Sequence, residues 1–505
     1  MKLNENSKRF FMNGILLTAV SLGMRTVALF FNAFVTREVG AVGIGLYTLV
    51  MTVYNFAVTF ATSGISLTVT RLVAEARGEG KEGEVGKILT GSVIYALIFS
   101  LIGAAVLFLG AEFFALRVLD DARTAICLKI LAPSLIPLAL ISVFSGYFVG
   151  IKRVAGNAVT QISGQLFKVG ITVFLIVATD SLTPERSAVC LSLGTTLTEL
   201  LCFFVIFLQY LVDKRGKKRE IGNAFPAVFK TAAPLAVSAY IRQALITLEH
   251  IIIPKRLRKY GESANEALAS YGTLHGMALP MVLYPMATLS SFSGLLVPEF
   301  AERSAKGDGD GMKSLASRAF GTTLSYAIVV CVFLLLFSEE LGYVIYNSRS
   351  AGVYIAVLAP VVPIMYLDHV TDSVLKGIGE QVYSMWVNIT DSILSVILVW
   401  LLIPKMGIMG YAICIVVMEG YNFLLSLIRL RVKIRFRISF VRSILLPGIS
   451  ALISAGISLG AFRRAGAQST PLLLIIEVVF ALCIYIGVSR LFSLLLTKKD
   501  SVTRP

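Results

Sequence analysis

The sequence predicts an all-α polytopic membrane protein of about fourteen transmembrane helices. The chain has 505 residues, of which 56% are hydrophobic and 15% are charged, whereas average soluble domains carry about 25% charged residues. Its mean hydropathy is +0.81. Apolar runs near the length of about 20 residues that crosses a bilayer recur along the whole chain. These observations exclude an ordinary soluble domain.

The predicted helices form two groups of six and a final pair. The first six lie at roughly 10–35, 45–70, 87–110, 126–149, 158–179 and 187–211, and the second six at 231–254, 272–298, 316–337, 351–375, 384–404 and 408–428. The final pair lies at 441–462 and 471–496. We expect an N-terminal lobe at 1–212, a cytoplasmic basic linker at 213–230, a C-terminal lobe at 231–430, and appended helices with a cytoplasmic tail at 431–505.

A weak internal repeat supports two pseudo-symmetric six-helix lobes. One constant shift of the chain aligns three short matches at equivalent places, namely Ala74-Glu75 with Ala301-Glu302, Gly150-Ile151 with Gly377-Ile378, and Leu175-Ile176 with Leu402-Ile403. Repeated lobes with a site between them are the usual architecture of alternating-access transporters.

Clusters of positive charge predict the orientation. Lys152-Arg153, the run 213–219 and the alternating stretch Arg429–Arg437 all lie in loops on one side, so the positive-inside rule places these loops and both termini in the cytoplasm. The alternating stretch could instead be a membrane-surface or nucleic-acid patch, but we favour the orientation role and expect no nucleic-acid partner. Lys255–Lys259 breaks the rule, either as a tolerated external cluster or as an outer site for phosphate or anionic lipid.

Five basic residues lie inside or at the edges of the apolar runs. A charge at the bilayer centre costs about 2.5–3.5 kcal/mol on insertion scales and persists where it faces a cavity or a partner. Cationic side chains at such depths suggest an anionic cargo. The five candidate binding residues are Arg25, Arg37, Lys168, Arg242 and Arg256.

Two spacings refine these candidates. Gln161, Gln165 and Lys168 share one helix face, which favours either a cavity lining or hydrogen bonds between packed helices. Arg242 and Glu249 lie on nearly the same face, so they form either an ion pair or part of a cavity.

Acidic residues in the spans are weaker candidates for ion coupling. They are Asp368, Asp372, Asp391 and Glu249. Asp368 and Asp372 share a face with Lys376, and neutralisation by that lysine is the interpretation we favour. Prolines at 280, 285 and 298, and at 360 and 363, predict interrupted helices.

Motifs for catalysis or a bound cofactor are absent from the sequence. It contains no Walker A, GxSxG or HExxH motif, and its six cysteines lack CxxC spacing. We therefore expect no enzyme activity, no catalytic residues, no cofactor and no metal. Transport would draw on ion gradients, the membrane potential or the gradient of the cargo.

Several segments carry a resemblance to a known family. They are Arg37-Glu-Val-Gly40-Ala-Val-Gly-Ile-Gly45-Leu-Tyr47, Gly146-Tyr-Phe-Val-Gly150 with Gln161 and Gln165, Ile253-Pro-Lys-Arg-Leu257, and Gly272-Thr-Leu-His-Gly276-Met-Ala-Leu-Pro280. Together they resemble polysaccharide exporters of the multidrug/oligosaccharidyl-lipid/polysaccharide (MOP, MATE-like) superfamily. The set looks like the stage V sporulation protein B branch, which is related to MurJ-type lipid II flippases.

The resemblance implies a flippase that moves undecaprenyl-pyrophosphate-linked saccharides, such as lipid II or a polysaccharide precursor, across the bacterial cytoplasmic membrane by alternating access. It implies that Arg25 and Arg242 contact the pyrophosphate, that Arg37 lies on the outward path, and that the last two helices hold the polyprenyl chain. Implied partners are the lipid-linked saccharide, membrane lipids and cell-wall or spore-assembly machinery. One departure is the turn 150–157, which lacks the proline usual in the family and leaves the saccharide open.

Two alternatives stay open at this point. One is a cation-coupled multidrug antiporter of the same superfamily, although the first predicted helix offers Arg25 and no carboxylate before Glu38. The other is a non-transporting membrane scaffold for cell-wall or spore assembly, in which the basic residues of the spans would be individually dispensable.

Overall fold

The structure is a computed structural model that describes residues 5–151, 153–179, 181–214, 222, 224–464 and 471–502. The side chain of Arg25 and most of the predicted basic linker lie outside the described residues. The chain divides into two compact units. Unit 1 comprises Met1–Arg37 and Thr273–Pro505, and unit 2 comprises Glu38–Gly272.

Helix α1 (Glu5–Thr62) enters both units, and its regular geometry is interrupted at Gly40, where φ is 74°. A positive φ of this size suits glycine, which has no Cβ. After α1, unit 2 contains α2 (Ile65–Gly78), η1 (Glu82–Glu84), α3 (Val85–Leu109), α4 (Ala111–Phe113), η2 (Phe114–Leu119), α5 (Thr124–Leu131), η3 (Ala132–Ser134), α6 (Leu135–Gly150), α7 (Val154–Val177), α8 (Pro184–Lys214), α9 (Phe225–Tyr260) and α10 (Ala264–Gly272).

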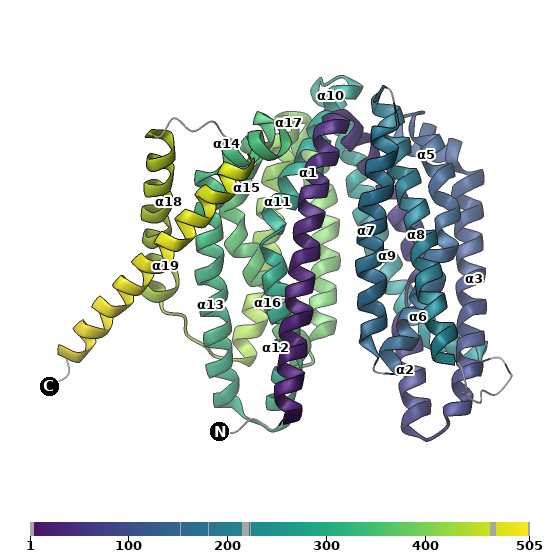
Figure 1. Ribbon diagram of the computed structural model, residues 1–505, viewed down its shortest axis with the longest axis horizontal. Coiled ribbons are helices and arrows are strands. Elements are labelled where there is room, and N and C mark those ends of the chain that lie inside the picture. The colour runs from purple at the N-terminus through teal and green to yellow at the C-terminus, as the bar shows by residue number, and fades with distance from the viewer. Residues whose placement is uncertain are drawn as a thin grey trace. The chain divides into compact units, whose positions relative to one another are not determined.

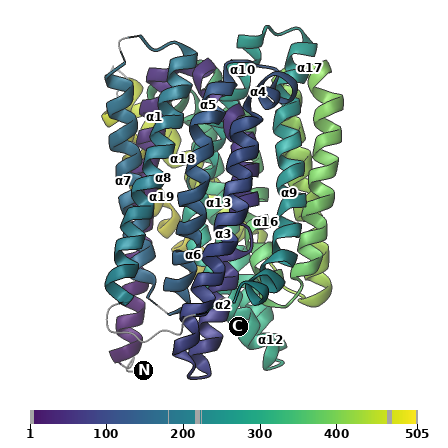
Figure 2. The same ribbon diagram turned by 90° about the vertical axis from the view of Figure 1, so that its right-hand side faces the viewer.

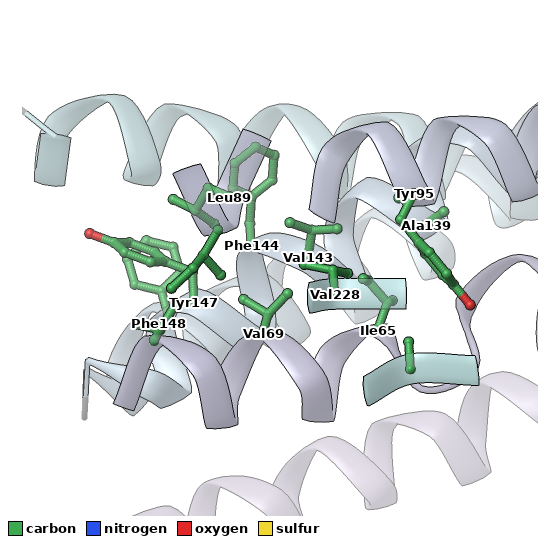
Figure 3. Packing of buried hydrophobic residues seen from close by; sticks show 14 of the residues in the cluster. Ile65, Val69, Leu89, Tyr95, Ala139, Val143, Phe144, Tyr147, Phe148 and Val228 are labelled. Carbon is green, nitrogen blue, oxygen red and sulfur yellow. The ribbon is translucent and has the colours of Figure 1, made fainter. Parts of the chain in front are cut away.

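The core of unit 2 lies between α2, α3, α6 and the start of α9. Figure 3 shows Ile65 and Val69 of α2 and Val143 of α6 in this cluster. A Cβ on Gly146 would lie 2.5 Å from the carbonyl oxygen of Ser66. Small residues at such crossings let transmembrane helices approach closely. The Gly146–Gly150 motif therefore holds α6 against α2.

A second glycine contact joins two of the segments that carry the family resemblance. A Cβ on Gly272 would lie 2.5 Å from the carbonyl oxygen of Ala41 and 2.6 Å from the nitrogen of Gly45. The backbone of α10 therefore packs directly on the part of α1 that follows Gly40. This contact requires glycine because any side chain would separate the two helices.

Unit 1 begins with the first part of α1, the long purple helix in Figure 1. The Asn32 side-chain amide donates to the carbonyl oxygen of Gly276 at 3.0 Å, and the hydroxyls of Thr26 and Tyr284 are 2.7 Å apart. The other elements of unit 1 are η4 (Thr273–Ala278), α11 (Leu279–Leu283), α12 (Met286–Ala305), α13 (Gly309–Leu336), α14 (Ser338–Glu340), η5 (Leu341–Ile345), α15 (Arg349–Leu358), η6 (Ala359–Val361), α16 (Val362–Gly377), α17 (Gln381–Lys433), η7 (Val441–Leu445), α18 (Leu446–Arg464) and α19 (Pro471–Val502).

Prolines interrupt the helices at most of the predicted places. Pro285 separates α11 from α12, and Pro360 lies in the short 3₁₀ turn η6 between α15 and α16. Pro298 is different, because it lies inside α12, which continues past it. The predicted interruption at Pro298 is therefore wrong, since one proline removes one backbone hydrogen bond without having to end the helix.

The chain is an all-helical, multi-pass membrane protein. Among the described residues, ten helical segments are long and apolar enough to cross a membrane. Two of them, Thr26–Gly78 and Gln381–Lys433, have 53 residues each, whereas one crossing needs about 20 residues. Each contains an interruption, at Gly40 and at Gly407. The architecture is consistent with the predicted fourteen helices.

The compact units have other bounds than the predicted lobes, and the division into lobes stays a prediction. Residues 1–37 group with the second half of the chain, and α9 groups with the first half. Val228 and Ala232 of α9 are fully buried in the core of unit 2. Helix α9 follows the predicted linker, so it could pack on either half of the chain. Its hydrophobic pattern alone does not distinguish the two possibilities.

Candidate functional site

A polar cavity lies within unit 2 between α6, α7 and α8. Its volume is about 310 Å³. Helices α7 and α8, which contribute most of its lining residues, run side by side (Figure 2). The lining residues are Ile141, Ser145, Asn157, Thr160, Gln161, Gly164, Gln165, Lys168, Thr198, Glu199, Cys202 and Ile206.

The α7 wall carries the three residues whose spacing predicts one polar face. Gln161, Gln165 and Lys168 all line the cavity, because positions three and four apart lie on the same side of a helix. Gly164 lies on the same wall, where a Cβ would be 2.8 Å from the Cys202 sulfur of α8. The structure thus brings these predicted residues together, while their role in binding cargo stays a prediction.

The α8 wall contributes Glu199, which the sequence analysis missed. The positive charge of Lys168 acts on this carboxylate, and both side chains are half-buried. Opposite charges in one cavity compensate each other's loss of water. The available signal was a carboxylate inside the predicted span 187–211, since ionisable residues in spans are functional candidates by default.

Amide and hydroxyl groups supply the remaining polarity. The Asn157 side-chain nitrogen donates to the Ser145 carbonyl oxygen at 3.3 Å, while its Oδ1 is buried without a hydrogen-bond partner among the described residues. The Gln209 side-chain nitrogen donates to the Thr160 hydroxyl at 3.4 Å. Buried polar atoms are normally paired. An unpaired acceptor in the cavity wall is therefore available to a hydroxyl donor.

The other predicted basic residues lie elsewhere. Arg37 is exposed close to Gly40, Arg242 is exposed on α9, and Arg256 is half-buried near the end of α9. These three side chains are outside the cavity lining. Arg25 lies in α1, but its side chain is outside the described residues. Glu249 is half-buried on α9, and its predicted pairing with Arg242 stays a prediction.

The basic cluster that breaks the orientation rule is the last turn of α9 rather than a loop. Arg258 forms an ion pair of 2.8 Å with Asp120, which follows η2. Nearby, Arg123 pairs with Asp121 at 2.6 Å and donates to Asn265 at 3.1 Å. Asp120 thus offsets one positive charge of the cluster, and the choice between a tolerated cluster and an anion site stays a prediction.

A second polar region lies between α16 and α17 in unit 1. Asp372 accepts a hydrogen bond of 2.5 Å from Ser384 and lies 3.5 Å from the Lys376 ammonium, which is the neutralisation that the sequence favours. Asp368 has a buried Oδ1 without a hydrogen-bond partner among the described residues.

The charges of Asp391 and Glu419 act on Asp368, together with that of Asp372. Glu419 was not predicted, although it too is a carboxylate within a predicted span. In the described part of the chain, no three His, Cys, Asp or Glu side chains are arranged to hold a metal ion. The ion-coupling role of Asp368, Asp372, Asp391 and Glu249 stays a prediction.

Comparison with protein families gives two matches. The family described as polysaccharide biosynthesis protein matches residues 10–304, and the MatE family matches residues 258–401. Stage V sporulation protein B of Bacillus subtilis (strain 168) is 27% identical over 510 residues, which covers 94% of this chain and 96% of the relative. Lipid II flippase MurJ of the same organism is 21% identical, covering 83% of this chain and 82% of the relative.

Solved structures share the fold. A lipid II flippase MurJ in an inward closed conformation matches with a TM-score of 0.73 and 16% identity, covering 96% of this chain and all of that one. An inward-facing multidrug resistance MATE family transporter of the MOP superfamily matches with a TM-score of 0.65 and 13% identity, covering 82% of this chain and 98% of that one. At these identities the likeness establishes the fold alone.

Proposed function

Since the chain belongs to the polysaccharide biosynthesis protein family, we propose that it is a flippase for polyprenyl-pyrophosphate-linked saccharides. The protein is a membrane transporter of the MOP superfamily, related to stage V sporulation protein B and to MurJ, and not an enzyme. The proposed cargo is a lipid II or polysaccharide precursor, moved by alternating access across the bacterial cytoplasmic membrane. Both termini are proposed to be cytoplasmic.

The observation that carries the proposal is the polar cavity of unit 2. A saccharide has many hydroxyl groups, and burying a hydroxyl in an apolar medium without a hydrogen bond costs roughly 2–7 kcal/mol. The cavity offers amides from Gln161, Gln165 and Asn157 in a helix bundle that is otherwise largely apolar. These groups can replace the water that a sugar loses on entering the membrane.

The charge balance of the cavity favours sugar over pyrophosphate. The lining contains one basic side chain, Lys168, and one carboxylic acid, Glu199, so the cavity carries at most one positive charge. A pyrophosphate requires cationic partners, which arginine supplies through paired hydrogen bonds. We therefore propose that the cavity takes the saccharide and that arginines outside it take the pyrophosphate, with Arg25 and Arg242 as the candidates.

A transport assay with matched variants tests the proposal. Full-length protein in proteoliposomes would be given a fluorescent undecaprenyl-pyrophosphate disaccharide, and the rate of its movement between leaflets measured. Each neutral hydrogen bond contributes about 0.5–1.5 kcal/mol, so the double change Gln161→Ala and Gln165→Ala should slow transport roughly tenfold.

The control is Leu166→Ala on the same helix. Leu166 is 58% exposed on α7 and does not line the cavity, so this change should leave the rate close to wild type. Wild-type rates in the double variant would place the cavity off the transport path. If Leu166→Ala loses transport while the double variant keeps it, the cavity also lies off the transport path.

A second candidate function, cation-coupled drug antiport, draws on the MatE match and on the carboxylates around Asp368. It predicts that overexpression of the protein raises resistance to organic cations and that Asp368→Asn removes this resistance. Unchanged drug resistance in the overexpressing strain would exclude it.

A further inference from the structure

The chain that joins α17 to α18 forms an alternating basic segment along unit 1. We define the basic strap as residues 431–439, which comprise the end of α17 and the non-helical stretch 434–439, whose first residue Ile434 is extended. Ile434 and Phe436 are 3% and 4% exposed in a core cluster, whereas Arg435 and Arg437 are exposed. Side chains alternate between two faces in extended backbone. The strap therefore presents its arginines outward and anchors itself through its apolar residues.

Contacts with α13 hold the strap in place. The ring of Phe436 lies 4.5 Å from that of Phe320, measured between centroids. The backbone nitrogen of Arg437 donates to the Ser317 hydroxyl at 3.3 Å. On the strap itself, the Arg431 guanidinium lies 5.3 Å from the centroid of the Phe436 ring. Because the backbone is anchored, the outward arginines keep a defined spacing.

Few acidic side chains among the described residues of unit 1 pair with the strap. Glu380 pairs with Lys433 at 2.7 Å and with Arg429 of α17 at 2.8 Å. Arg435 and Arg437 form no side-chain ion pair with a described residue. Arg318 of α13, next to Ser317, is also exposed. One carboxylate cannot neutralise this set, so the outward face of the strap is strongly cationic.

The stretch 434–439 of the strap lies between two candidate membrane spans, Gln381–Lys433 and Val441–Phe462. The strap therefore runs at a membrane surface. It lies just before η7 and the N-terminus of α18 (Figure 1). Phe440 and Val441, directly after the strap, are 60% and 46% exposed. Basic residues next to exposed apolar side chains are typical of segments at the boundary between lipid headgroups and acyl chains.

We propose that the basic strap binds the phosphate headgroups of anionic phospholipids, with Arg435 and Arg437 as the main contacts. Guanidinium groups match phosphate oxygens in both charge and geometry. The exposed Phe440 and Val441 favour a lipid, because the acyl chains of a bound phospholipid would lie against them. This site is independent of the cargo cavity and lies in the other unit.

Lipid titration of the full-length protein tests the proposal. Native mass spectrometry in a neutral detergent would count bound short-chain phosphatidylglycerol and, separately, phosphatidylcholine. The wild type should prefer phosphatidylglycerol. Each basic residue near an anionic surface contributes about 1 kcal/mol, so each arginine changed to glutamine should weaken this affinity about fivefold. The double variant Arg435→Gln and Arg437→Gln should lose the preference.

The matched control changes Arg117 and Arg186 to glutamine, two exposed arginines of unit 2, and should keep the preference. Size exclusion and thermal unfolding in phosphatidylcholine check the fold of each variant. The single change Arg435→Gln, which removes no side-chain ion pair with a described residue, serves if the double variant does not fold. Retained phosphatidylglycerol affinity in a folded variant, or equal loss in the control, would refute the proposal. Binding of soluble glycerol phosphate as tight as that of phosphatidylglycerol would refute it too, since the acyl chains would then contribute nothing and the strap would recognise free phosphate.

Discussion

The close approach of α2 and α6 leads to a quantitative prediction at Gly146. A Cβ at this position would lie 2.5 Å from the Ser66 carbonyl oxygen and 3.0 Å from the Cβ of Val69. Neither atom can move without its backbone, so Gly146→Ala must separate the two helices. Overpacking of this kind typically costs about 1–3 kcal/mol, while replacing glycine by alanine in a helix gains up to about 1 kcal/mol.

Gly170→Ala isolates the steric part of this cost. Gly170 is exposed in the helix α7, and a Cβ there would meet no atom within 4 Å. The variant Gly170→Ala therefore gains the same helix propensity as Gly146→Ala without a steric clash. The difference between the two variants in free energy of unfolding should therefore be about 1–3 kcal/mol, with Gly146→Ala the less stable.

The assay is thermal unfolding of the purified protein in one detergent, together with the flipping rate in proteoliposomes. Gly146→Ala should also slow transport, because α6 carries Ser145 and Ile141 of the cavity wall. Equal unfolding midpoints for Gly146→Ala and Gly170→Ala would contradict the packing argument. If the midpoints are equal and the flipping rate is still lower only in Gly146→Ala, the effect on transport does not come from separation of the two helices.

Two further predictions concern charge. Arg25→Ala or Arg242→Ala should abolish transport of the lipid-linked saccharide while leaving membrane insertion intact, and full activity of both variants in a flipping or complementation assay would contradict the assigned role. At the turn between α16 and α17, hydrogen bonds from Lys433 and Arg429 hold the pKa of Glu380 below its usual value of 4.5. The contribution of ionised Glu380 to the free energy of unfolding should thus be complete above about pH 4.5. It should disappear as the pH falls through the lowered pKa. The midpoint difference between wild type and Glu380→Gln, measured against pH, checks this sign.

Much of the fold follows from the sequence because the bilayer imposes strong constraints. Span length and apolar content predict the helices, and the breaks at Pro285 and Pro360 follow from the missing backbone donor. The shared face of Gln161, Gln165 and Lys168 follows from helical periodicity alone. These features depend on residues near one another in the chain.

Features that depend on distant residues were harder to predict. Glu199 lines the cavity opposite Lys168, but the pairing becomes visible only when α7 and α8 are placed together. The grouping of α9 with the first half of the chain depends on Val228 and Ala232 entering the core of unit 2. Apolar residues at these two positions would suit packing on either unit, so the hydrophobic pattern does not decide which unit α9 joins.

The interruption at Gly40 has a mechanical consequence. The backbone passes between the two units only twice, at Arg37–Glu38 inside α1 and at Gly272–Thr273 where α10 meets η4. Any rotation of one unit against the other must therefore be absorbed by a few dihedral angles at these two points. Gly40 stands three residues from the first crossing, and Gly272 forms the second. Gly40 and Gly272 are thus placed where a pair of hinges would be.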